Sequence, residues 1–225
     1  MFNLDNWRIT LLKIIGSIGL GAMGGSYAKH LLQNNYRVFG IDPDKENSKY
    51  FTSLGGIILN NINDLISKSD VIILSLPTVP IFQEIIKEIE KCKSFSDPKV
   101  IIDMNTISLE DKLDAKNKLE KLNISIIDAP VSGTGAQAKT KDLVVMSSGN
   151  EKIVSECEDI FNSFARKNIF VGEFGNGIKF KILANLLVTV HNTVTAEALL
   201  LGQKVGLDSQ KIYEVLNAGA ATSVM

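Results

Sequence analysis

Short runs rich in isoleucine and valine alternate with helix-like stretches along most of the chain, and this alternation limits the folds open to it. The apolar runs are KIIGSIG (13–19), YRVFGID (36–42), VIILSLP (71–77), KVIIDMN (99–105), ISIIDAP (124–130), LVVMSS (143–148) and NIFVG (168–172). Strands separated by helices are typical of a mainly parallel sheet. The runs are continuously apolar, as expected when helices cover both faces of the sheet. The sequence therefore predicts an α/β fold with a doubly wound sheet.

A helical pattern replaces the strands after the break EFGNG (173–177). One long helix is predicted from about Ile178 to Lys204, and a second begins behind an N-cap aspartate, Asp208. We therefore predict two domains. Residues 1–174 form the sheet domain, and residues 175–225 form the long interdomain helix and the start of an incomplete all-α domain.

The predicted second domain is too small to bury its own apolar helix. Segments of about 40 to 60 residues rarely form an adequate core alone. Either a partner chain or further residues must cover the helix. We therefore expect a homo-oligomer that assembles through the C-terminal helical region.

The first strand is followed by a glycine-rich turn that fits the pattern G-x-G-x-x-G. Its members are Gly19, Leu20, Gly21, Ala22, Met23 and Gly24. A predicted strand precedes the turn and a helix follows it, which is the setting of a dinucleotide-binding turn. In that setting the three glycines permit a tight turn, a close approach of the backbone to a pyrophosphate, and close packing of the helix. A purely structural glycine turn remains the alternative.

Asp42 ends the second predicted strand, 18 residues after Gly24, close to the ~20 that the dinucleotide motif requires. Its carboxylate would accept hydrogen bonds from the adenosine ribose and repel a 2′-phosphate. The expected cofactor is NAD, although NADP is not excluded. Alternatively, Asp42 with Pro43 only begins a loop.

Three further strand ends carry residues suited to ligand binding. Leu76 and Pro77 close the strand 71–77 at the edge where such sheets bind ligands, although the proline also serves to end a strand. The segments DMNT (103–106) and DAPVSGTG (128–135) follow the next strands and would meet the same crevice. Hydroxyls and bare backbone in SGTG suit a carboxylate, although such a segment is also an ordinary loop.

Four motifs give the chain its resemblance to a known family. They are GLGAMG, DMNTIS, DAPVSGTGAQAKTKDLVVMSSG and GNGIKFKILANLL, in that order. From about Lys13 to its end the chain resembles the β-hydroxyacid dehydrogenases. The resemblance implies a Rossmann-like domain joined by a long helix to an all-α domain, and reversible NAD(P)-dependent oxidation of a small 3-hydroxy acid. It also implies roles for single residues: Ser132, Gly133 and Thr134 bind the substrate carboxylate, Thr106 lies near the cofactor, and Lys181 with Asn185 is catalytic.

The chain departs from the family pattern in several places. Asn105 stands where the family usually has serine, Thr134 where it has glycine, and Ala184 where it has asparagine. Family members also continue beyond the position of Met225, so the resemblance implies a C-terminally truncated chain. The alternative function is a catalytically impaired member that keeps only dinucleotide binding. A third reading is a 6-phosphogluconate dehydrogenase, which should have several basic residues near DAPVSGTG to bind the substrate phosphate. Near that segment this sequence has only Lys139 and Lys141.

Helical geometry separates the two lysines of GNGIKFKILANLL. At about 100° per residue, Lys181 shares a face with Asn185 and Asn192, whereas Lys179 points toward Leu183 and the other apolar positions. Hydroxyl oxidation requires a base that takes the oxygen-bound proton. We expect Lys181 to be this acid-base group; a surface lysine whose methylenes lie on an apolar face is the alternative.

Composition excludes other classes of function. A net charge of −1 offers no basic field for nucleic acid or anionic lipid. Only two histidines are present, and Cys92 and Cys157 lie far apart, which argues against a metal site or a disulfide scaffold and favours the cytoplasm. The apolar stretch 9–28 is interrupted by Lys13, and the later apolar helix contains several polar residues. We therefore expect neither a signal peptide nor a membrane span.

Overall fold

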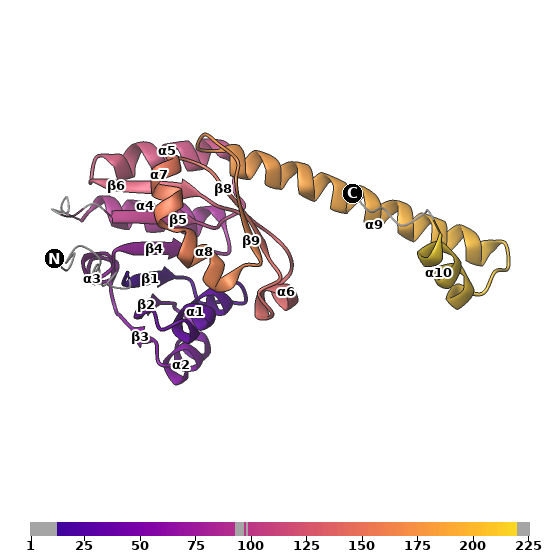
Figure 1. Cartoon of the computed structure of the whole chain (residues 1–225), viewed down its shortest axis with the longest axis horizontal. Coiled ribbons are helices and arrows are strands. Elements are labelled where there is room, and N and C mark those ends of the chain that lie inside the picture. Colours follow the sequence, from indigo (N-terminus) through magenta and orange to yellow (C-terminus); the bar gives the residue numbers. More distant parts are fainter. Residues whose placement is uncertain (1–12, 93–96, 98, 220–225) are drawn as a thin grey trace, which may run out of the picture. The chain divides into compact units, whose positions relative to one another are not determined.

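The computed structural model describes residues 13–92, 97 and 99–219. Its centre is a six-stranded sheet in the order β3-β2-β1-β4-β5-β6, and every neighbouring pair is parallel. The strands are β1 (Ile15–Ile18), β2 (Val38–Ile41), β3 (Ile57–Ile58), β4 (Val71–Leu74), β5 (Lys99–Asp103) and β6 (Ile124–Asp128). Figure 1 shows them stacked in this order. The predicted α/β class with a doubly wound parallel sheet is confirmed.

Helices cover both faces of the sheet. One apolar core includes residues of α1 (Gly24–Gln33), α2 (Lys45–Ser53), α6 (Gly135–Lys139), α7 (Glu151–Glu156) and α8 (Glu158–Phe164). The core on the other face includes residues of α3 (Ile62–Lys68), α4 (Val79–Glu90) and α5 (Leu109–Glu120). All four residues of β1 and of β4 are buried between these layers. This is why β4 (VIIL) is continuously apolar and why β1 (IGSI) has only the small Ser17 as a polar residue.

A second, small sheet contains β7 (Val131–Ser132), β8 (Val144–Ser147) and β9 (Lys167–Phe170). The pair β7–β8 is antiparallel and the pair β8–β9 is parallel. A bridge joins this sheet to the end of β6: Asp128 N donates to Ser148 O at 3.0 Å, and Ser148 N donates to Asp128 O at 2.8 Å. The predicted strands 143–148 and 168–172 therefore exist, but they lie outside the main sheet.

Two helices follow the sheets, as predicted. They are α9 (Asn176–Lys204) and α10 (Ser209–Ala218), and the Asp208 carboxylate caps α10 by accepting from Lys211 N at 3.0 Å. Gly206, with φ 84°, ends the first helix. The chain divides into two compact units between Lys181 and Ile182, so the division falls inside α9.

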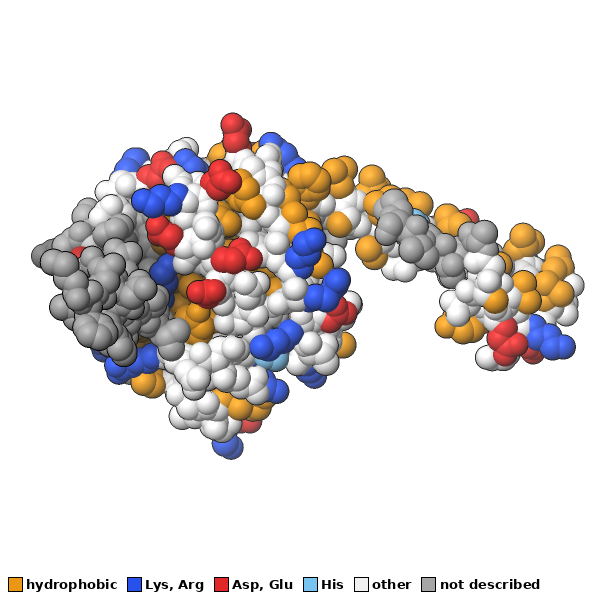
Figure 2. Space-filling model, in the orientation of Figure 1, with side chains coloured by type: hydrophobic (Ala, Val, Ile, Leu, Met, Phe, Trp, Pro, Cys, Tyr) orange, Lys and Arg blue, Asp and Glu red, His pale blue; other side chains and the backbone are white. Residues whose placement is uncertain are grey.

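The unit from Ile182 onward leaves most of its apolar side chains exposed. Gly202 and Ile212 pack together, since a Cβ on Gly202 would lie 2.5 Å from Ile212 Cδ1. In contrast, Leu183 is 56% exposed and Leu186 is 58% exposed, and Figure 2 shows hydrophobic side chains along α9. In the described part of the chain, α9 is the one helix long and apolar enough to cross a membrane by length and composition.

The apolar stretch 9–28 is partly described. From residue 13 on it forms β1, the glycine turn and the beginning of α1. Residues 9–12 lie outside the described residues. The described part of this stretch is therefore an element of the sheet domain.

Candidate active site

The predicted cofactor residues gather at one edge of the main sheet. The turn 19–24 follows β1, Asp42 follows β2, Leu76 and Pro77 follow β4, and Thr106 follows β5. All of these strands are parallel, so their carboxyl ends share this edge. The strand order reverses between β1 and β4, which is the position where sheets of this type bind their ligand.

The three glycines of the turn have different surroundings. A Cβ on Gly19, whose φ is 93°, would lie 2.1 Å from Ser75 O, and a Cβ on Gly24 would lie 2.1 Å from Gly19 O. Gly21 has nothing within 4 Å of that position and is exposed. The first and third glycines thus permit close backbone packing, whereas the second leaves its backbone open. Helix α1 also begins without a side-chain cap, so this geometry fits a pyrophosphate.

Asp42 fixes the glycine turn to the end of β2. Its Oδ2 accepts from Leu20 N at 2.6 Å, and its Oδ1 accepts from Asp44 N at 2.8 Å. Two carboxylate oxygens offer about four acceptor sites. Oδ1 also accepts from Asn47 Nδ2 at 3.4 Å. The half-buried carboxylate therefore retains about one acceptor site for a ribose hydroxyl.

Asn105 connects the ends of β4 and β5. Its Oδ1 accepts from Leu76 N at 2.6 Å. Pro77 and Thr106, on either side of this bond, are exposed. The asparagine that replaces the usual serine of the family pattern thus has a structural role, because it sets the position of the loop that follows β4.

The predicted substrate residues lie between β7 and α6. Ser132 is half-buried at the end of β7, and Gly133 has φ 138°, a conformation that favours glycine. A Cβ on Gly135 would lie 3.9 Å from Ala22 Cβ. The His30 ring also contacts Ala138 O through Nε2 at 3.0 Å, which joins α1 to α6. The structure therefore brings the predicted substrate segment against the glycine turn.

Thr134 is the N-cap of α6. Its Oγ1 accepts from Gln137 N at 3.3 Å, and its backbone N donates to Gln137 Oε1 at 2.9 Å. The hydroxyl also lies 3.2 Å from Gln137 Oε1. These bonds occupy the polar groups of Thr134, so a carboxylate ligand at this residue requires the Gln137 side chain to move.

The two lysines of α9 differ in burial. Lys179 is exposed, and its Nζ donates to Asn176 Oδ1 at 3.1 Å. Lys181 is half-buried, and burial lowers its pKa from the ordinary lysine value. Asn185, the predicted partner of Lys181, is exposed and belongs to the second unit.

The first turn of α9 packs closely against the end of β6. A Cβ on Gly177 would lie 2.5 Å from Met146 O and 2.9 Å from Asp128 O. Gly177 N donates to Ser148 Oγ at 3.0 Å, and Ile178 N donates to Asp128 Oδ2 at 2.9 Å. The glycine therefore permits a contact that any other residue would prevent.

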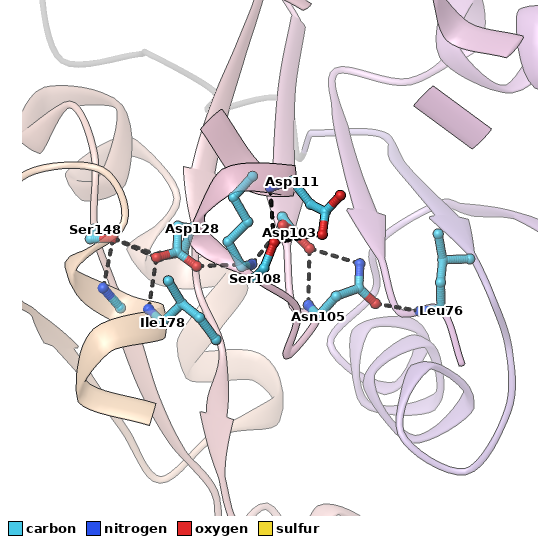
Figure 3. A network of polar contacts seen from close by, with 10 residues as sticks. Leu76, Asp103, Asn105, Ser108, Asp111, Asp128, Ser148 and Ile178 are labelled. Atoms are coloured by element: carbon cyan, nitrogen blue, oxygen red, sulfur yellow. Dashed lines mark hydrogen bonds and ion pairs between the residues drawn. The ribbon is translucent and has the colours of Figure 1, made fainter. Parts of the chain in front are cut away.

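A fully buried ionic cluster lies beside this turn (Figure 3). We call Lys112, Asp103 and Asp128 the buried triad; all three side chains have 0% exposure. Lys112 Nζ lies 2.6 Å from Asp103 Oδ2 and 3.0 Å from Asp128 Oδ1. Burial alone would lower the pKa of Lys112, but the two carboxylates outweigh it and raise that pKa above its ordinary value.

The sequence did not identify Lys112. It lies in the charge-rich segment LEDKLDAKNKLE, where a lysine is normally solvated. The only available signal is position, since Lys112 shares a helix face with Ala115 and Leu119, and these three are the buried residues of α5. Asp103 and Asp128 were expected to meet the ligand crevice, but both carboxylates lie in the interior.

A hollow of about 830 Å³ lies elsewhere, lined by Ile41, Asn60, Asn61, Ile62, Asn63, Glu88, Lys91 and Cys92. None of the predicted site residues lines it. Its two charged lining residues, Glu88 and Lys91, form an ion pair with each other, so the hollow gives no reason to move the candidate site away from the glycine turn.

Most of the chain is similar to known protein families. Residues 14–172 match the family described as the NAD binding domain of 6-phosphogluconate dehydrogenase. Residues 175–225 match the family described as NAD-binding of NADP-dependent 3-hydroxyisobutyrate dehydrogenase. The chain is therefore covered by two consecutive nucleotide-binding families.

Individual proteins show the same relationship. The 2-(hydroxymethyl)glutarate dehydrogenase of Eubacterium barkeri is 30% identical over 213 residues, which cover 93% of this chain and 70% of that protein. The mitochondrial 3-hydroxyisobutyrate dehydrogenase of Homo sapiens is 30% identical over 207 residues, 90% of this chain and 61% of that protein. A structure of Mycobacterium tuberculosis 3-hydroxyisobutyrate dehydrogenase with L-serine superposes with a TM-score of 0.85 at 25% identity, covering 95% of this chain and 72% of that one. The chain thus spans between 61% and 72% of the length of these three proteins.

Proposed function

The chain belongs to the β-hydroxyacid dehydrogenase family, and from this we propose that it interconverts a small 3-hydroxy acid and its oxo (semialdehyde) form, with Lys181 as general acid and base. The observation that carries the proposal is the meeting of the glycine turn with the segment 132–135 at the ligand-binding edge of the sheet. The half-buried Lys181 follows the first turn of α9, which packs on the end of β6 through the bond from Ile178 N to Asp128 Oδ2.

The turn 19–24 and Asp42 would hold the cofactor. A bound nicotinamide supplies a hydride acceptor in oxidation and a hydride donor in reduction. NAD(P) is the cofactor of the family, and the charge of Asp42 supports NAD as the preferred form. Leu76, Pro77 and Thr106 would line the same edge toward the nicotinamide.

Lys181 would move the proton. In oxidation its neutral amine accepts the proton of the substrate hydroxyl, and in reduction its ammonium returns it. Burial lowers the pKa of Lys181, which brings the neutral form closer to physiological pH. Asn185, four residues on, is proposed to orient the amine or the hydroxyl.

The substrate class follows from the segment 132–135 and from the relatives. The names 3-hydroxyisobutyrate and 2-(hydroxymethyl)glutarate both denote carboxylates with a hydroxyl on the β carbon. We propose that Ser132 and Gly133 bind such a carboxylate, and that Thr134 joins them once Gln137 is displaced. Only two basic residues, Lys139 and Lys141, closely follow this segment in the sequence. A site for a phosphorylated substrate should have more basic residues, so this small number supports a hydroxy acid without phosphate.

The exposed apolar side of α9 suggests a partner. We propose that a second copy of the chain covers it, and that the protein works in the cytoplasm without nucleic acid or membrane. The net charge of −1 and the free thiols of Cys92 and Cys157 support this setting.

A second candidate function is dinucleotide binding alone. In this alternative the protein binds the dinucleotide without turning over a hydroxy acid. Its support is the engagement of Thr134 with Gln137, which occupies part of the proposed carboxylate site.

Turnover by purified protein tests both functions. We expect NAD(P)H to form, by absorbance, with one or more acids of a panel of 3-hydroxy acids. Lys181→Ala should remove most turnover and leave cofactor binding intact, whereas the matched Lys179→Ala should change little. Cofactor binding without turnover would favour the alternative, and full turnover by Lys181→Ala would refute the role of that lysine.

A further inference from the structure

A buried chain of polar contacts connects the cofactor side of the proposed site with the helix that carries Lys181 (Figure 3). On the cofactor side, Asn105 holds the loop after β4 through Leu76 N. Asn105 N and Nδ2 both donate to Asp103 Oδ1, at 2.9 Å and 2.7 Å. Asp103 Oδ2 then contacts Lys112 Nζ. The ends of β4 and β5 are thus fixed to α5.

The chain of contacts continues to α9. Lys112 Nζ lies 3.0 Å from Asp128 Oδ1 and forms a buried ion pair with it. Asp128 Oδ2 accepts from Ile178 N at 2.9 Å and from Ser148 Oγ at 3.1 Å. Ile178 is in the first turn of α9, three residues before Lys181.

The net charge of the buried triad explains why Asp128 contacts the N-terminus of α9. The buried triad contains two carboxylates and one ammonium, so it carries one net negative charge when all three groups are ionised. The N-terminus of a helix carries partial positive charge and unpaired N–H groups. Asp128 faces this end of a 29-residue helix. The excess charge of the triad is therefore compensated by α9 itself.

We propose that Asp128 is a positioning residue for Lys181, and that Lys112 holds the Asp128 carboxylate in the orientation that fixes the first turn of α9. The proposal rests on the proposed role of Lys181. Asp128 cannot touch a substrate, because it has no exposed surface. It acts through the helix turn, whose displacement would move the proton carrier relative to the substrate hydroxyl.

Asp128→Asn is the principal test, because it leaves one carboxylate and one ammonium in the interior and should fold. A neutral amide binds Ile178 N more weakly than a carboxylate does. We expect faster amide hydrogen exchange at Gly177 and Ile178. We also expect kcat to fall by about tenfold or more, since misplacement of a catalytic group by about 1 Å can cost 100-fold. The dissociation constant of NAD should stay the same.

Lys112→Met is the second variant, and Lys116→Met is its matched control on the same helix. Lys116 makes a surface ion pair with Glu120. Lys112→Met should reproduce the exchange and kcat effects of Asp128→Asn, whereas Lys116→Met should show neither. Should Lys112→Met fail to fold, Asp128→Asn with the same two measurements decides the question alone.

A double-mutant cycle distinguishes positioning from general destabilisation. In a Lys181→Ala background, Asp128→Asn should lower the residual turnover no further. An equal fold-loss in both backgrounds would overturn the proposal, as would unchanged exchange at Gly177 and Ile178. If the wild-type protein turns over no hydroxy acid, the proposed function fails, and the exchange comparison still decides whether Asp128 fixes this turn.

Discussion

Lys181 and Lys179 stand two residues apart on α9, and their amines have different surroundings. Lys179 keeps its ammonium at the surface beside Asn176. Lys181 loses part of its hydration, and this desolvation lowers its pKa. Neutralisation of an amine at accessible pH is what a proton carrier for hydroxyl oxidation requires.

The pH dependence of turnover should follow from this lowered pKa. In the proposed mechanism, oxidation needs the neutral amine of Lys181, so kcat/KM for the hydroxy acid should rise as pH increases through the folded-state pKa of this lysine. Reduction needs the ammonium form, so kcat/KM for the oxo acid should fall as pH increases through the same range. The midpoint should lie below the ordinary lysine pKa, because burial of Lys181 disfavours its charged form. Rate profiles in both directions measure it. If the same pH dependence persists in Lys181→Ala, the titrating group is a residue other than Lys181.

The choice of cofactor should depend on the charge of Asp42. Asp42→Asn keeps an acceptor for Leu20 N and removes the charge that would repel a 2′-phosphate. We expect the ratio of kcat/KM for NADP to that for NAD to rise by about tenfold, equivalent to about 1.4 kcal/mol. Steady-state kinetics with both cofactors measures the ratio.

Asp44→Asn is the matched control for this substitution. Asp44 caps α2 by accepting from Glu46 N and Asn47 N, so its loss should leave the ratio unchanged. An equal shift in both variants would mean that the general field of the loop, rather than the Asp42 carboxylate, selects the cofactor.

Single residues could be predicted only where local pattern determines their environment. The glycine turn was identified because its spacing is local, and the structure adds the reason for each glycine. Lys112 was not identified because its role depends on two carboxylates that reach it from other strands. The engagement of Thr134 with Gln137 was also missed, although the two stand three residues apart, as in a capping box.

At the scale of elements, the contact between α9 and β6 depends on Gly177. A Cβ there would lie closer to Met146 O and Asp128 O than real contacts allow. Gly177→Ala should therefore displace the first turn of α9 and lower the free energy of unfolding by about 1 to 3 kcal/mol. Denaturant unfolding measures this change.

Gly135→Ala provides the comparison for that prediction. Its Cβ would meet Ala22 Cβ at 3.9 Å, an ordinary contact, and Gly135 also begins a helix. This variant should be as stable as the wild type or more so. Equal stability of Gly177→Ala would show that the turn can move away from β6 at little cost.

Elements were predicted well where a run of apolar residues is long enough to show its period. Seven predicted strands are present, but β3 and β7 have two residues each and leave no pattern. The sequence also could not show that β8 and β9 form a separate sheet, because strand pairing depends on contacts between distant residues.

At the scale of the whole molecule, the exposed apolar side of α9 should govern association. Leu186→Glu would place a charge among side chains such as Leu183 that are more than half exposed. We expect the wild type to have the mass of at least a dimer by light scattering, and Leu186→Glu to shift toward the monomer.

Thr195→Glu is the control, because nine residues at about 100° each place Thr195 on the opposite side of α9 from Leu186. It should leave the mass unchanged. A wild-type monomer would refute self-association through this helix, and a monomer that sediments with lipid vesicles would instead identify a membrane as the partner of α9.

The division of the chain just after Lys181 also bears on how proteins of this kind can diversify. Every contact described here for the start of α9 is made within the nucleotide-binding unit, through Asp128, Ser148 and the close approach at Gly177. The lysine that we propose as the proton carrier therefore belongs to the same compact unit as the glycine turn. A recombination event that joined a different helical segment at Ile182 would replace the exposed apolar surface and leave Lys181 with the contacts that hold the first turn of α9.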